Sequence, residues 1–164
     1  MHADSMTTQR VADFQAVVAA PGFCLGVRCD EWEIHSLEYL APGPELAPRN
    51  PLAAEAVRQL RAYLSEPDFA FGLPLRPSGT AFQRRVWELI ASIPNHQTRS
   101  YGELAKALHN APRAVGQACG ANPFCLVVPC HRVIAAGGAL GGFSRQGSGF
   151  LLDVKRWLLA HESV

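Results

Sequence analysis

Two proline- and glycine-rich breaks constrain this chain more than any other feature of its sequence. Residues 41–48 read Ala-Pro-Gly-Pro-Glu-Leu-Ala-Pro, and residues 73–79 read Leu-Pro-Leu-Arg-Pro-Ser-Gly. Proline fixes its own φ, lacks an N–H donor and disfavours helix at the residue before it, so neither stretch supports regular structure. The second break coincides with a change in charge: residues 1–79 carry six Arg against ten Asp or Glu, and residues 80–164 carry nine Lys or Arg against four. We therefore predict two domains, residues 1–78 and 79–164.

The first domain has the pattern of a small α/β unit with an antiparallel sheet. Short apolar or alternating runs predict strands at residues 14–18, 24–27, 32–40 and 69–75. Pro21-Gly22 lies between the first two runs and is typical of a hairpin turn. From Pro51 onward, apolar residues recur at helical spacing, and proline is favoured in the first turn of a helix. The chain as a whole is expected to be α+β.

The second domain is predicted to be mainly helical. Thr80 with Gln83 matches a capping box at the start of one helix, and Ser100 with Glu103 matches a second. After a short turn, a third helix is expected at residues 113–121. Helix, short turn, helix is the arrangement of a winged-helix-like helix-turn-helix, which binds DNA.

The predicted helix at residues 113–121 consists almost entirely of small residues. Gly116 and Gly120 lie inside it, and each costs about 1 kcal/mol relative to alanine. Small residues allow the backbone to approach a partner closely, either the narrow minor groove of DNA or a neighbouring helix. The net charge of +5 over residues 80–164 favours a polyanion as partner but does not decide between the two.

A cysteine and a histidine follow one another directly after a proline in the second domain. The apolar run Cys125–Val128 predicts a strand that ends at Pro129, so that Cys130 and His131 lie at an element boundary. A thiol is a strong nucleophile only as thiolate, and a histidine that accepts its proton is the usual activator. Because adjacent side chains point in different directions, a water molecule or a turned backbone must bridge the pair. A buried structural cysteine beside a surface histidine is the alternative reading.

Cysteine usage indicates free thiols. The chain has an odd number of cysteines, no export signal and no apolar run of membrane-spanning length, which together predict a cytoplasmic protein. The cysteines are at positions 24, 29, 119, 125 and 130. Their spacing to histidines does not match a zinc finger, so we expect no metal and no cofactor.

A series of short motifs in the second domain resembles one known family. In chain order the motifs are Gly79-Thr-x-Phe-Gln83, Val86-Trp87, Ile93-Pro94, Ser100-Tyr-Gly-Glu-Leu-Ala105, Arg113-Ala-Val-Gly116, Asn122-Pro123 and Pro129-Cys-His-Arg-Val133. This series resembles the O6-alkylguanine-DNA alkyltransferases (methylated-DNA–protein-cysteine methyltransferases). The resemblance is strong over residues 79–162, and residues 14–75 are compatible with the family's small N-terminal domain.

The resemblance implies DNA repair by direct reversal in a single turnover. An alkyl group passes from O6 of guanine in DNA, with O4-alkylthymine as a further candidate substrate, to the acceptor that matches Cys130. His131 resembles the base that removes the thiol proton through a water, and Glu162 resembles the carboxylate that orients it. Tyr101 resembles the phenol that donates a proton toward the purine. Asn122 resembles the residue that ties the small-residue helix to the active-site loop.

The resemblance also implies contacts to double-stranded DNA through the minor groove. The target base must leave the stack to be reached, and Arg113 resembles the finger that fills its place. The other implied DNA contacts are Ala114, Gln117, Cys119 and Gly120, and the implied pocket residues are Phe143, Ser144 and Val133. The protein is expected to be a monomer, with cooperative binding along DNA left open. It is expected to work at the nucleoid in a bacterial cell or in the nucleus of a eukaryotic one.

Three departures from the family pattern affect these expectations. Pro112 directly precedes Arg113 and places it in the first turn of its helix. An additional Arg-Gln-Gly-Ser-Gly stretch follows Ser144, which predicts a longer pocket lid. Cys29 and His35 match only part of the structural zinc site that some relatives carry.

Two other classes of protein also contain some of these features. A hydrolase of thioesters or peptides would use Cys130, His131 and Glu162 with repeated turnover and an oxyanion hole. A helix-turn-helix regulator would bind a defined DNA sequence, but the predicted helix at residues 113–121 offers few side chains that read bases.

Overall fold

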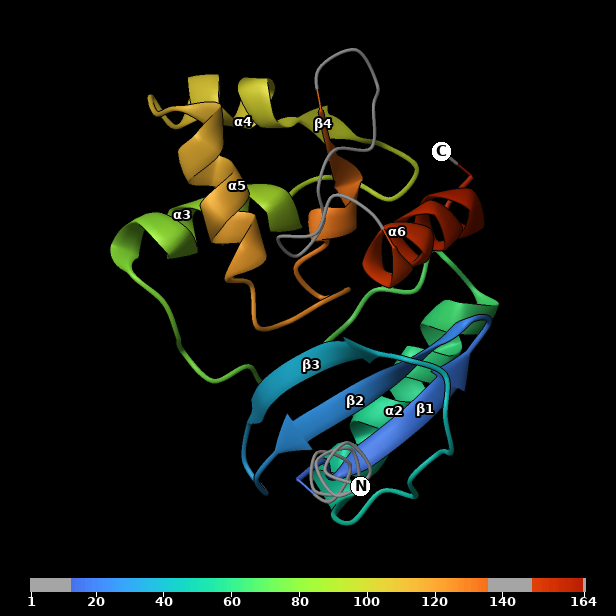
Figure 1. The fold of residues 1–164 in the computed structure, drawn as a ribbon. Coiled ribbons are helices and arrows are strands. Elements are labelled where there is room, and N and C mark those ends of the chain that lie inside the picture. The colour runs from blue at the N-terminus through green and yellow to red at the C-terminus, as the bar shows by residue number, and fades with distance from the viewer. Residues whose placement is uncertain (1–12, 136–148, 164) are drawn as a thin grey trace, which may run out of the picture. The chain divides into compact units, whose positions relative to one another are not determined.

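The first half of the chain is built on a three-stranded antiparallel sheet with one helix packed on it (Figure 1). The computed structural model describes residues 13–135 and 149–163. The strands are β1 (Ala16–Ala20), β2 (Phe23–Cys29) and β3 (Ile34–Leu40), with β2 in the centre. Ala20 pairs with Phe23, so Pro21 and Gly22 form the predicted two-residue hairpin turn. Gly22 has a φ of 85°, as glycine after proline commonly has in a type II turn.

Both faces of β2 are covered by apolar side chains. Helix α2 (Pro51–Ser65) packs against β1 and β2, and its N-terminus is capped by the side chain of Asn50. Phe14, Val17 and Cys24 form a buried cluster with Leu40 and Leu46 on the sheet. Because side chains alternate along a strand, β2 contributes to this cluster from one face and to the α2 interface from the other. The predicted strands and helix of this half are therefore present, with one exception.

The predicted strand at residues 69–75 is wrong. These residues are irregular, and only Leu75 forms an isolated bridge, to Ile34. The buried amide of Gln59 on α2 takes the place of a strand partner: it accepts from Gly72 N (2.9 Å) and donates to Gly72 O (3.0 Å). Side-chain hydrogen bonds thus satisfy this backbone without a sheet ladder.

The second half is mainly helical. Its elements are α3 (Ala81–Ala91), β4 (Arg99–Ser100), α4 (Tyr101–Ala107), α5 (Pro112–Gly120), the 3₁₀ turn η1 (Cys130–Arg132), β5 (Val133–Ile134) and α6 (Phe150–His161). Thr80 and Gln83 form the predicted capping box of α3, and Ser100 Oγ accepts from Glu103 N at the start of α4. Helix α5 packs against both α3 and α4, and α4 and α5 form the predicted helix-turn-helix. The α+β class is confirmed.

The chain divides into two compact units, Met1–Arg76 and Pro77–Val164. The family-like motifs all lie in the second unit. Within it, β4 and β5 pair in parallel, with Arg99 opposite Val133 and Ser100 opposite Ile134. This short ladder places the N-terminus of α4 beside the end of η1.

The predicted strand Cys125–Val128 is also wrong, because this segment is a turn. Val128 N donates to Phe124 O (2.9 Å), and Leu126 has a φ of 68°. The side chain of Asn122 bonds Phe124 N and Val128 O at the two ends of the turn (both 2.9 Å). An apolar run alone does not distinguish a strand from a buried turn of this kind.

Gly79 provides a test of the packing at the start of the second unit. It has a φ of 85°, and a Cβ at this position would lie 2.5 Å from the Trp87 ring. The ring cannot shift freely, because its Nε1 donates to Ala118 O on α5 (2.8 Å). Gly79→Ala is therefore expected to lower the free energy of unfolding by roughly 1–3 kcal/mol. Urea unfolding measures the loss, and Gly72→Ala, whose Cβ would meet no atom within 4 Å, is the matched control with little expected change.

Candidate active site

Cys130 lies at the start of η1, directly after the turn, and is almost fully buried. Asn122 Nδ2 donates to Cys130 Sγ (3.3 Å) as well as to Val128 O. One amide therefore fixes both the backbone before the cysteine and the position of its sulfur. These contacts join the end of α5 to the loop that carries Cys130.

His131, Arg132 and Glu162 form a buried cluster. His131 Nε2 lies 2.7 Å from Glu162 Oε2, and both side chains are fully buried. Arg132 donates from Nε to Glu162 Oε1 (2.8 Å) and from Nη2 to Oε2 (3.1 Å). A two-pronged guanidinium contact of this kind compensates the charge of a buried carboxylate. Arg132 Nη1 also donates to Ile93 O (2.8 Å), so the cluster is attached to the turn after α3.

The other nitrogen of His131 is available to accept a proton. A carboxylate only accepts hydrogen bonds, so the Nε2 that faces Glu162 carries the hydrogen of the neutral ring. Among the residues that the structure describes, the buried Nδ1 has no hydrogen-bond partner. Burial lowers the pKa of His131 more than contact with Glu162 raises it, so the imidazole is neutral near pH 7.

The thiol of Cys130 is protonated in the resting protein. A hydrogen bond with the Cys119 side chain and burial raise its pKa well above the ordinary value. The Asn122 amide and the charge of Lys155 act in the opposite direction but are outweighed. Since the thiolate is the nucleophile, a base must take the proton before or during the reaction.

Lys155 brings a positive charge to the same place. Its side chain is fully buried, and Nζ donates to Val133 O (2.7 Å) and lies 5.9 Å from the centre of the Tyr101 ring. Burial lowers the pKa of Lys155 to about 8, while interaction with Cys119 and Cys130 raises it. Near pH 7 most of the lysine is therefore charged. Burial also raises the pKa of Tyr101, which keeps the phenol protonated as a hydrogen-bond donor must be.

Sequence reasoning missed Lys155 and the role of Arg132 in the site. Lys155 precedes Leu158 and Leu159 by three and four residues and therefore lies on the apolar stripe of α6, a signal that was available. Arg132 gives no such signal, because its partners are distant in the sequence.

The residues expected to contact DNA lie on α5, but their exposure differs. Arg113 and Gln117 are exposed, and Ala114 and Gly120 are half-buried. The Cys119 side chain, expected at the DNA surface, is instead buried against Cys130, because it lies on the opposite face of the helix. Arg113 follows Pro112 in the first turn of α5, as predicted.

The outer side of α5 borders an open hollow of about 680 Å³. Phe82 and Gln83 of α3 form one wall, and Ala114, Gly116 and Gln117 form the other. Small residues on α5 leave this surface shallow and accessible. Phe143 and Ser144 lie outside the described residues, and of the expected pocket residues only Val133 is placed, fully buried beside Lys155.

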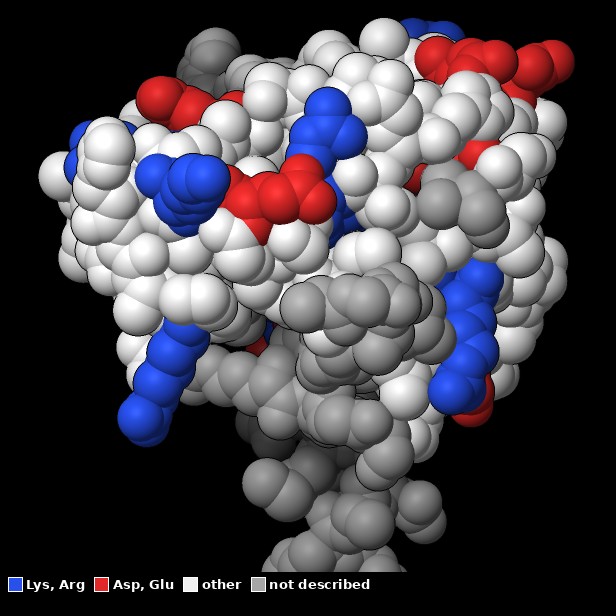
Figure 2. All heavy atoms as spheres, turned by 90° about the horizontal axis from the view of Figure 1, so that it is seen from above, with Lys and Arg blue, Asp and Glu red and all other residues white. Residues whose placement is uncertain are grey.

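Basic side chains do not form one continuous patch on the face shown in Figure 2. Lys and Arg lie singly there, between uncharged surface and acidic side chains.

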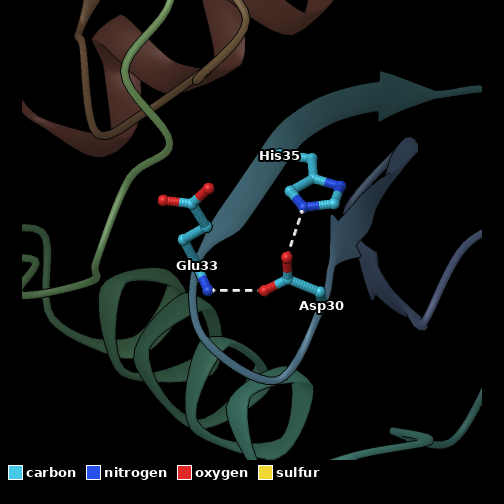
Figure 3. A group of neighbouring side chains, drawn as sticks. All are labelled: Asp30, Glu33 and His35. Carbon is cyan, nitrogen blue, oxygen red and sulfur yellow. Dashed lines mark hydrogen bonds and ion pairs between the residues drawn. The ribbon is translucent and has the colours of Figure 1, made fainter.

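A second group of potential ligands, outside this site, lies at the turn between β2 and β3. Asp30, Glu33 and His35 offer ligand atoms within 4.8 Å of one another. Figure 3 shows the Asp30 carboxylate between the His35 ring (3.0 Å) and the backbone N–H of Glu33 (2.8 Å). These contacts account for the arrangement without a metal ion. The Cys29 thiol donates to Asn50 Oδ1 (3.7 Å) and is not a member of the group.

The fold and the site together define the class of protein: a helix-turn-helix unit that holds a buried cysteine next to a buried His–Glu pair. The family model for the 6-O-methylguanine DNA methyltransferase, DNA binding domain, matches residues 81–164. A methylated-DNA–protein-cysteine methyltransferase of Methanosarcina acetivorans is 48% identical over 110 residues, which are 66% of this chain and 67% of that protein. A methylated-DNA–protein-cysteine methyltransferase of Mycolicibacterium paratuberculosis is 50% identical over 116 residues, which are 69% of this chain and 67% of that protein.

Solved structures agree with the sequence relatives. The Mycobacterium tuberculosis OGT in complex with DNA is 36% identical, has a TM-score of 0.75 and is similar over 89% of this chain and 90% of its own. The chain therefore belongs to the 6-O-methylguanine DNA methyltransferase family. Its activity is the direct reversal of DNA alkylation by transfer of the alkyl group to a protein cysteine, and DNA is its binding partner. The hydrolase and regulator readings are set aside.

In the part of the chain that the structure describes, the helices are too short or too polar to cross a bilayer.

Proposed function

We propose that Cys130 is the alkyl acceptor of this family member and that each molecule reacts once. The observation that carries this assignment is that a buried His131–Glu162 pair, joined to Arg132, directly follows the buried Cys130, with the pKa of the thiol raised and the pKa of the imidazole lowered. Nucleophile, base and orienting group have the order of a hydrolytic triad, but the electrophile is a saturated carbon.

In the proposed reaction, the Cys130 proton passes through one water molecule to Nδ1 of His131. The sulfur attacks the alkyl carbon, the carbon–oxygen bond to guanine O6 breaks, and its electron pair stays on the purine. Tyr101 donates a proton toward the purine as negative charge develops, and the proton held by His131 then returns to Tyr101 through water, so that the purine leaves as neutral guanine. Lys155 stabilises the thiolate as it forms. The product is a thioether, which has no leaving group, so the protein does not turn over.

We propose that DNA is bound through its minor groove by the exposed side of α5. Support comes from the small residues on this side and from the accessible hollow beside it. Arg113 is exposed in the first turn of α5, where a long cation reaches beyond the helix end. The target base must leave the stack to reach a buried thiol, and Arg113 fills its place. The domain of residues 79–164 carries out both DNA binding and alkyl transfer. The protein acts as a monomer, in the compartment that contains the DNA.

The acceptor assignment predicts the mass of the reacted protein. After exposure to a duplex containing O6-methylguanine, the intact chain should gain the mass of one CH₂ on the peptide that holds Cys130. Cys130→Ser should gain nothing and still bind DNA, because the contacts to DNA do not involve the sulfur. Cys24→Ser, which changes a buried cysteine of the first unit, is the control and should react normally. Methylation of the serine variant at any cysteine would refute the assignment.

The pH dependence of the single-turnover rate follows from His131. Its pKa lies below the ordinary value of about 6.5 because the ring is buried. Protonated His131 cannot accept the thiol proton, so on the acid side of the profile, below the range in which Lys155 loses its charge, the rate should be level near pH 7 and fall only as pH drops below about 6.5. Rapid-quench measurements with free O6-benzylguanine give this profile without contributions from DNA binding. A midpoint above pH 7 would contradict the proposed role of His131.

Base extrusion predicts that Arg113 matters only in duplex DNA. Flipping a base costs a few kcal/mol of stacking and pairing, and an inserted arginine recovers part of this loss. Arg113→Ala should slow repair of duplex DNA by about tenfold or more, slow repair of single-stranded oligonucleotide much less, and leave reaction with free O6-benzylguanine unchanged. Rate constants for the three substrates test this. An equal loss on all three would show that Arg113 supports folding instead.

A further inference from the structure

The turn between α3 and β4 contacts the residue that holds His131. His96 in this turn donates a short hydrogen bond from Nδ1 to the main-chain oxygen of Glu162. The two residues are 66 positions apart in the sequence. The same turn begins at Ile93, whose carbonyl accepts from Arg132. Both the backbone of Glu162 and the arginine that compensates its carboxylate are therefore attached to one short segment.

His96 has a backbone conformation that histidine rarely adopts. Gln97 N donates to Pro94 O (3.2 Å), which makes residues 94–97 a β-turn with His96 at its third position. Its φ is 69°, and a positive φ at this position is usually supplied by glycine or asparagine. His96 N donates to the Asn95 side chain (3.0 Å), which holds this conformation.

Glu162 needs an anchor of this kind because it lies at a helix end. It is the C-cap of α6, and carbonyl groups in the last turn of a helix have no partner within the helix. The contact from His96 satisfies one of them and fixes the backbone that carries the carboxylate. A small rotation at this end would move Glu162 Oε2 away from His131 Nε2, now 2.7 Å apart.

We propose that His96 is a positioning residue for alkyl transfer: by holding the main chain of Glu162, it keeps the carboxylate on His131 and the base in its reactive orientation. His96 acts through Glu162 and does not touch the substrate. The inference rests on the proposed roles of Cys130, His131 and Glu162.

The test compares substitutions that all accept a positive φ. His96→Gly removes the side-chain donor, whereas His96→Asn retains a donor close to the position of Nδ1. The rate constant for benzyl transfer from free O6-benzylguanine to Cys130, followed by intact mass, should fall about tenfold or more in the glycine variant and within about threefold in the asparagine variant. In a Glu162→Gln background, His96→Gly should change the rate by less than about twofold, because the carboxylate that it positions is gone.

Controls separate this role from a general effect on folding. His109 lies in the α4–α5 turn, is exposed and also has a positive φ of 53°, so His109→Gly should leave benzyl transfer unchanged. Thermal unfolding checks that each variant is folded. His96→Asp has the size of the asparagine variant but carries an acceptor in place of the donor, so it should react as slowly as the glycine variant. It replaces the glycine variant in the test if that variant does not fold.

The outcomes separate this inference from the proposed function. Equal rates for wild type and His96→Gly would overturn it, as would a full tenfold loss in the Glu162→Gln background. If wild type transfers no alkyl group to Cys130, the proposed function itself fails, whatever His96 does.

Discussion

The second unit depends on the hydrogen bonds that the buried carboxylate of Glu162 makes with its neighbours. It binds His131 on one side and receives two hydrogen bonds from Arg132 on the other. Removing one partner from a buried ion pair costs about 3–5 kcal/mol, because the remaining charge is left without compensation. Arg132 also binds Ile93, so α6, η1 and the turn after α3 are joined around one charge. The carboxylate that contacts His131 therefore also holds these segments together.

Under the role proposed for Cys130, this arrangement keeps the nucleophile inactive until it is needed. Burial and the Cys119 thiol hold Cys130 protonated, while Lys155 and Asn122 are positioned to stabilise the thiolate once the proton leaves. A neutral, buried thiol reacts slowly with oxidants and with electrophiles in solution, since both attack the thiolate. For a protein whose acceptor is used once, protection at rest matters as much as reactivity toward the substrate. In the proposed mechanism the His131–Glu162 pair supplies the base that meets both requirements.

Features that depend on local rules could be predicted from the sequence. Contacts between distant side chains could not be derived from local patterns, and the pairing of His131 with Glu162 was expected only because of the family resemblance. The capping box of Thr80, the Pro21-Gly22 turn and the start of α5 at Pro112 follow from a few neighbouring residues. The two wrong strands share one cause: the side chains of Gln59 and Asn122 satisfy backbone groups that an apolar pattern assigns to a sheet. The placement of Cys119 against Cys130 likewise appears only when α5 is packed.

The parallel pair β4–β5 affects how far the protein can be divided. Each strand is two residues long. Strand β4 directly precedes the helix-turn-helix, and strand β5 directly follows η1, which begins at Cys130. Arg99 and Ser100, which lead into α4, have their ladder partners only in residues that follow η1. A fragment that ended before Val133 would leave the start of α4 without this ladder. The helix-turn-helix is therefore not structurally independent: its first helix begins on a ladder whose other strand lies beyond Cys130, so the two helices and the cysteine segment form one unit.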